Sequence, residues 1–165
     1  MAQRPGNWLA TPGLHPGLGA RFQLGENSPS KPVGSASNFD ATNLIHDNGV
    51  AIKPGTNVRS LDVHMAPAIT VVASETRNLG LTAPTLTSAQ DRHHTDGSLH
   101  PDGKALDFRG RNITIAEGRA LAGRVSQRLG PNYDVQFETF PNNPANNHLH
   151  TEYDPKPPRK SRGRK

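Results

Sequence analysis

The chain has 165 residues, a net charge of +5 and a mean hydropathy of −0.69, and its length suits one domain with appendages. Its 16 Gly and 15 Pro indicate that a fair part of the chain is loop or extended arm. The absence of cysteine excludes disulfides and thiol chemistry. No stretch approaches the roughly 20 apolar residues of a membrane span, and the N-terminus lacks the apolar core of a signal peptide.

Residues 1–57 predict an extended arm, because RPGN, TPGLHPGLG, DNG and KPGTN interrupt any helical period. One or two short strands are expected within it, for example near residues 49–52. Trp8, the only tryptophan, predicts an anchor that packs against the domain or a partner. The arm is therefore the expected contact for neighbouring proteins.

Hydrophobic periodicity predicts a compact domain over residues 58–155. One amphipathic helix is expected over residues 59–81, starting or kinking at Pro67, and a second over residues 115–129. Short strands are expected at residues 84–88, 105–108, 133–138 and 148–153. The order of helix, two strands, helix and two strands predicts an α+β fold, in which two helices lie on one side of a small antiparallel sheet.

The positive charge is concentrated in residues 156–165, KPPRKSRGRK, which contain six cations and no acid. Removing these six charges from the total of +5 leaves residues 1–155 at −1. Such a basic tail is typical of a solvated chain end; the alternative is contact with a polyanion such as nucleic acid or an anionic cell-wall polymer. A nucleic-acid binder of this kind would lose its binding when the tail is removed.

Two stretches carry residues suited to chemistry, GSLHPDGKALDFRG at 97–110 and NNHLHTEYDP at 146–155. In the first, a turn leading into a strand can bring His100 back beside Asp107, and the small residues between them leave room for the returning backbone. In the second, the two-residue period of a strand places His148, His150 and Glu152 on one face. Imidazole and carboxylate groups are ligands that zinc prefers, so His100, Asp107 and one of the later histidines form a candidate metal site.

The combined pattern S-x-H-x-x-G-x-A-x-D, then H-x-H, resembles the zinc D-Ala-D-Ala carboxypeptidase/dipeptidase family over about residues 58–155. That family includes VanX-type dipeptidases, phage L-Ala-D-Glu endolysins and the Hedgehog signalling domain. The resemblance implies a Hedgehog/D,D-peptidase-like fold and Zn²⁺ bound by His100, Asp107 and His150. It implies that His148 acts beside the metal, on the substrate side or in support of the ligands.

The same resemblance suggests, less specifically, that residues just before the motif contact the substrate. Family members often place an arginine or histidine there to contact a substrate carboxylate or a developing oxyanion. Arg92, with His93 and His94, occupies this place in the present chain. The alternative is an ordinary polar loop.

The chain departs from the family at the general base. Many members have Glu or Asp three residues before the last ligand histidine, but here that residue is Asn147, whose neutral amide cannot accept a proton. Glu138 is the first candidate base, provided that its strand runs beside the H-x-H strand and the insert TFPNNPANN (139–147) loops outward. Glu152 is the second candidate, although in the family its position resembles a ligand support. The third possibility is a site without a base.

The expected function is a zinc metallopeptidase that cleaves peptidoglycan stem-peptide amides, as a D,D-carboxypeptidase or a phage endolysin. Made in the cytoplasm without a signal peptide, it would reach the cell wall after lysis or as part of a phage particle. The alternative is a catalytically impaired peptidase-fold module that is a structural or docking component of a virion. Asn147 and the insert favour this alternative, whereas the intact ligand set opposes it.

Overall fold

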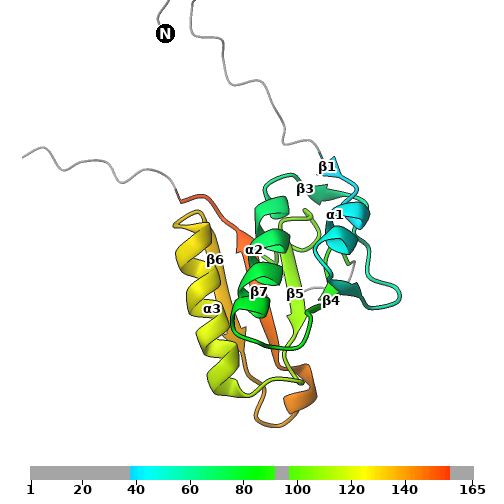
Figure 1. Cartoon of the computed structure of the whole chain (residues 1–165). Coiled ribbons are helices and arrows are strands. Elements are labelled where there is room, and N and C mark those ends of the chain that lie inside the picture. The colour runs from blue at the N-terminus through cyan, green and yellow to red at the C-terminus, as the bar shows by residue number, and fades with distance from the viewer. Residues whose placement is uncertain (1–37, 92–96, 157–165) are drawn as a thin grey trace, which may run out of the picture. The chain divides into compact units, whose positions relative to one another are not determined.

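The computed structural model describes residues 38–91 and 97–156 (Figure 1). Within them the helices are α1 (Thr42–Asp47), α2 (Met65–Asn78), α3 (Ile115–Leu129) and the 3-10 helix η1 (Pro144–Asn146). The strands are β1 (Asn38–Phe39), β2 (Ala51–Ile52), β3 (Leu61–Asp62), β4 (Thr85–Ser88), β5 (Ala105–Arg109), β6 (Tyr133–Glu138) and β7 (His148–Tyr153). Trp8, Arg92, His93 and His94, and all of the basic tail beyond Lys156, lie outside the described residues.

Five strands form the main sheet, in the order β2-β4-β5-β7-β6. All neighbours in this sheet are antiparallel except β2, which pairs with β4 in parallel. Strands β1 and β3 form a separate antiparallel pair. The α+β class is confirmed, but the main sheet is mixed rather than wholly antiparallel, because β2 adds a parallel edge strand.

Helices α2 and α3 cover one face of this sheet (Figure 1). The side chains of Leu106, Phe108 and Leu149 point toward them and are at most 2% exposed, because burying this apolar surface drives the layers together. Alternate strand residues point to opposite faces. The residues between these apolar positions, including Asp107 and His150, therefore project from the other face.

The helix starts follow from local sequence. At α3, Thr114 accepts a hydrogen bond from the Glu117 N–H, and the Glu117 side chain accepts one from the Thr114 N–H, so a capping box fixes the start at Ile115. At α2, Pro67 is the third helical residue, where no intrahelical N–H bond is lost. The proline is therefore tolerated without a kink being required. Among the described residues, no helix is long and apolar enough to cross a membrane.

The segment assigned to an extended arm is structured from Asn38 onward. Ala41 and Ile45 of the α1 region are fully buried, and Val50, just before β2, is 6% exposed. These side chains belong to the same core as α2 and the sheet. The compact domain therefore begins before residue 58, and the predicted boundary is corrected for residues 38–57. The six-residue helix α1 buries only Ile45, which leaves too little periodicity for recognition from sequence.

Candidate metal centre

Strand register gathers the candidate residues on the sheet face opposite the helices. In the β5–β7 pair, Asp107 lies opposite His150. In the β6–β7 pair, Glu138 lies opposite His148. Residues directly opposite one another share a face of the sheet, so each histidine of the H-x-H motif stands beside one acid from a neighbouring strand.

His100 reaches the site through a tight turn. The Gly103 N–H donates to the His100 carbonyl at 2.9 Å, and Gly103 has a φ of +69°, a conformation that favours glycine. A Cβ on Gly103 would lie 2.6 Å from the Ser60 carbonyl oxygen, which leaves no room for any other residue. The expectation that small residues between His100 and Asp107 leave room for the turn agrees with this geometry at Gly103.

The ring of His100 is held in one orientation. The side chain is 3% exposed, and its Nδ1 lies 2.7 Å from the Ala89 carbonyl oxygen. A carbonyl can only accept, so Nδ1 carries the proton and donates it. Nε2 is thereby left to face Asp107 Oδ1, 3.4 Å away, in the manner of a metal-ligating imidazole oriented by its other nitrogen.

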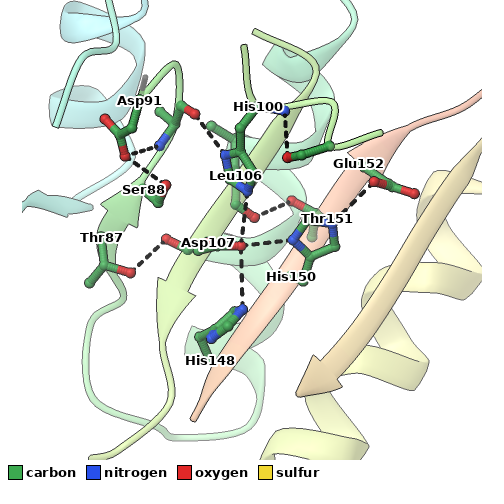
Figure 2. A network of polar contacts seen from close by, with 12 residues as sticks. Thr87, Ser88, Asp91, His100, Leu106, Asp107, His148, His150, Thr151 and Glu152 are labelled. Carbon is green, nitrogen blue, oxygen red and sulfur yellow. Dashed lines mark hydrogen bonds and ion pairs between the residues drawn. The ribbon is translucent and has the colours of Figure 1, made fainter. Parts of the chain in front are cut away.

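Asp107 stands at the centre of the cluster (Figure 2). Its Oδ1 lies 2.8 Å from His150 Nδ1 and 3.6 Å from His148 Nε2, in addition to its contact with His100. Burial acts to raise the pKa of Asp107, but the hydrogen bonds from His100 and His150 outweigh it and hold the pKa well below its usual range. The carboxylate is therefore ionised and available as a ligand.

His150 lies between two carboxylates. Its Nδ1 faces Asp107, and its Nε2 lies 3.2 Å from Glu152 Oε2 (Figure 2). Burial acts to lower the pKa of His150, but the hydrogen bonds and charges of Asp107 and Glu152 raise it to about 9. Glu152 thus orients the ring from the side away from Asp107, as a carboxylate does behind a metal-bound histidine.

The donor atoms lie close enough together to hold a metal ion. One ligand atom from each of His100, Asp107 and His150 lies within 4.8 Å of the others. Tetrahedral zinc with bonds of about 2.0–2.2 Å requires donor atoms about 3.3–3.5 Å apart. Asp107 Oδ1 lies 3.4 Å from His100 Nε2 and 2.8 Å from His150 Nδ1. The first distance agrees with this value, and the second would have to lengthen by about half an ångström when an ion binds. The three predicted ligands therefore form a group that could hold a metal ion.

A second group of possible ligands shares His150 with the first. Glu138, His148 and His150 also bring one ligand atom each within 4.8 Å of one another. His148 Nδ1 lies 2.7 Å from the Asn146 carbonyl, so its Nε2 faces Glu138 Oε2 at 3.2 Å. The structure therefore places Glu138 and His148 together at the edge of the cluster, where both were expected.

The insert at residues 139–147 does not loop away from the site as expected. The Phe140 ring stacks on His148, with centroids 5.6 Å apart and an interplanar angle of 22°. Asn147, which the resemblance aligns with a carboxylate, instead closes the loop, since its side-chain oxygen accepts the Phe140 N–H at 2.8 Å. The insert folds back because these contacts, and the turn of η1, stabilise it against the end of the sheet.

Sequence reasoning missed two contributors near this site. The Ala89 carbonyl orients His100, and no side-chain signal could reveal it. Arg109 lies opposite His148 and two residues after Asp107 on the same strand. The two-residue period that grouped the H-x-H histidines could have found Arg109 as well.

Comparison with models of known protein families and with curated protein sequences finds no match for this chain.

Proposed function

We propose that this protein is a zinc-dependent peptidase that hydrolyses the peptide amides of peptidoglycan. The observation that carries the proposal is the convergence of His100, Asp107 and His150, from a turn and two strands, within reach of one metal ion. The same residues occupy the ligand positions of the S-x-H-x-x-G-x-A-x-D and H-x-H pattern. Action at the cell wall after lysis, or from within a phage particle, is part of this proposal.

Some residues of the site would bind the metal ion, and others would act on the substrate. His100, Asp107 and His150 would hold the ion, while Glu152 keeps the His150 ring in place through its 3.2 Å contact. A bound zinc ion would supply Lewis-acid chemistry, polarising the scissile carbonyl and lowering the pKa of a coordinated water toward about 7.

Glu138 is the proposed general base, because its strand pairs with the H-x-H strand as this role requires. Although the insert folds back instead of looping outward, the Glu138 side chain is still 37% exposed and stands beside His148, so it can reach a substrate water as well as the protein. It would take the proton of the attacking water and pass it to the departing amine. His148 Nε2 lies between Glu138 and Asp107 and faces the substrate side of the site. Because Nδ1 donates to the Asn146 carbonyl, only the protonated ring would also donate from Nε2 to the substrate or to the developing charge.

Purified peptidoglycan tests the proposal directly. The protein loaded with one zinc per chain is expected to release new primary amines, a chelator should stop the release, and added zinc should restore it. His150→Ala, which removes a ligand, is the matched control and should release none. A protein that holds zinc stoichiometrically and yet releases no amine would contradict the peptidase and favour the structural or docking module of a virion.

A further inference from the structure

A cleft of about 410 Å³ lies beside the candidate metal centre. His148 belongs to both, since it lines the cleft and its Nε2 faces Asp107. Arg109, which also lines the cleft, pairs with His148 across the β5–β7 ladder. The volume is within the range of roughly 300–1,000 Å³ typical of small-ligand sites. A group in this cleft would therefore lie next to whatever binds at the metal.

The cleft is positively charged. Lys53, Arg109 and Arg111 line it, and no acidic residue does. Within residues 38–91 and 97–156 these three cations form no ion pair, whereas Arg124 and Arg128 both pair with Glu75. Uncompensated cations in a concave surface attract anions. An arginine also presents a planar set of N–H donors that matches a carboxylate.

The insert supplies part of the wall of the cleft. Phe140 and Ala145 give that wall an apolar part, and Phe140 stacks on His148. The wall is fixed in place because the Gly110 N–H donates to the Asn147 carbonyl at 2.8 Å. A Cβ on Gly110 would lie 2.7 Å from the same carbonyl, so the loop packs as closely as the backbone allows. The lining of the cleft thus combines three cations with a small apolar surface.

We infer that this cleft binds the free carboxylate of an anionic peptide substrate whose scissile amide lies at the metal centre. The inference rests on the proposed peptidase function and defines its substrate class. Stem peptides with a free carboxyl group near the cleaved amide are preferred over those in which that group is a carboxamide. Lys53 and Arg111, both exposed, and the half-buried Arg109 are the specificity determinants.

Two peptides and two double variants test the inference. The peptides are L-Ala-γ-D-Glu-L-Lys and its analogue in which the free α-carboxyl of D-Glu is a carboxamide. The test variant is Lys53→Gln/Arg111→Gln. The control is Arg59→Gln/Arg119→Gln, which removes two exposed positive charges outside the cleft. Zinc content and thermal melting verify that each protein is folded and loaded.

Binding to the zinc-loaded protein is measured by NMR titration, and mass spectrometry shows whether the peptide stays intact. The parent and the control variant should bind the carboxylate peptide about 10-fold more tightly than the carboxamide, the scale of one or two charge-assisted hydrogen bonds. The test variant should lose this preference with its zinc retained. An unchanged preference in the test variant, or no preference in the parent, would overturn the inference. No binding of either peptide, together with binding of a short DNA duplex that depends on Lys53 and Arg111, would also overturn it.

This experiment tests the carboxylate site and the peptidase activity separately. A preference that depends on Lys53 and Arg111, without hydrolysis of any peptide, would support the cleft and contradict the peptidase. Hydrolysis of both peptides at equal rates and affinities would support the peptidase and contradict the carboxylate subsite.

Discussion

Removing one histidine at a time distinguishes the two groups of ligands that share His150. If the metal is held by His100, Asp107 and His150, then His100→Ala should release zinc and His148→Ala should retain it. If Glu138, His148 and His150 hold it, the order is reversed. His150→Ala should release zinc in either case, and serves as the reference for a lost ligand.

The structure favours the first group and sets the expected magnitude. The His100 side chain is buried and oriented by the Ala89 carbonyl at 2.7 Å, so little order must be gained on binding. Replacing a residue that hydrogen-bonds a metal ligand lowers the metal affinity by roughly 10–100-fold. Removing the ligand His100 itself should therefore lower the zinc affinity by more than about 100-fold, or ~2.7 kcal/mol. His148 Nε2 lies 3.6 Å from Asp107 Oδ1, the most distant of the three contacts at that oxygen. Its loss should change the affinity by less than about 10-fold.

Competition with a chromophoric zinc chelator, at one pH and one salt concentration, gives the zinc dissociation constant of each variant. Thermal melting of the metal-free proteins separates loss of a ligand from loss of the fold, which matters for the buried His100. A His100→Ala protein that is folded and binds zinc with the parental affinity, while His148→Ala does not, would refute the assignment.

Three further predictions use other parts of the domain. Gly103→Ala should lower the free energy of unfolding in urea by more than Gly49→Ala does. Both glycines have φ near +70°, so alanine at either position adds about 1–2 kcal/mol of backbone strain. Only at Gly103 would the new Cβ also meet a backbone atom, at 2.6 Å. Glu75→Gln should lower it by roughly 1–3 kcal/mol at neutral pH, since the side chain is 6% exposed and Arg128 donates to it at 2.7 Å. The Arg128 hydrogen bond lowers the pKa of Glu75 despite its burial, so this contribution is present above the ordinary value of 4.5 and is lost as pH falls; a gap between parent and variant that persists in acid would contradict it. In protein freed of metal by a chelator, NMR should show His150 titrating near its raised pKa of about 9. The stability that comes from its pairing with Asp107 is therefore complete below pH 6.5 and is lost as the pH rises to about 9. A His150 that titrates near pH 6.5 would refute the pairing.

Elements with strong local signals were predicted well from the sequence. Helix α3 has a clear apolar period and a capping box at Thr114, and its observed bounds are the predicted ones. Strands β6 and β7 also match their predicted residues, and the two-residue period placed His148, His150 and Glu152 on one face of β7, whereas the choice of His150 as a ligand came from the family resemblance. Such features depend on neighbours in the chain, which the sequence displays directly.

The features that were missed depend on contacts between distant segments. A short strand was expected near residues 49–52, and β2 lies there, but its two residues carry no pattern that could predict its parallel pairing with β4. Folding of the insert onto His148 depends likewise on the ring of Phe140 and the side chain of Asn147, both in a segment whose Pro and Asn content suggests only a loop. For the same reason the positively charged cleft could not be predicted, because Lys53 comes from the segment that was assigned to the arm.

The final prediction concerns Glu138, where the chain departs from the family it resembles. Glu152 already contacts His150 Nε2, so its carboxylate serves the ligand rather than a substrate water. Asn147 accepts the Phe140 N–H, and Asn147→Asp would keep that contact and stay in the loop. Of the two carboxylates considered for the base, Glu138 contacts His148 instead of the proposed ligand His150 and is the more exposed, at 37% against 26% for Glu152.

Glu138→Gln keeps the size of the side chain and its contact with His148 but cannot accept a proton. Zinc affinity should stay within about 10-fold of the parent, because Glu138 is not a ligand in the favoured group. Amine release from peptidoglycan should fall by roughly 100-fold or more, the scale of a general base. Asn147→Asp in the same protein should restore little of it, although the family pattern taken alone predicts a partial rescue. Loss of zinc from Glu138→Gln would instead make Glu138 a ligand, and parental turnover would exclude it as the base.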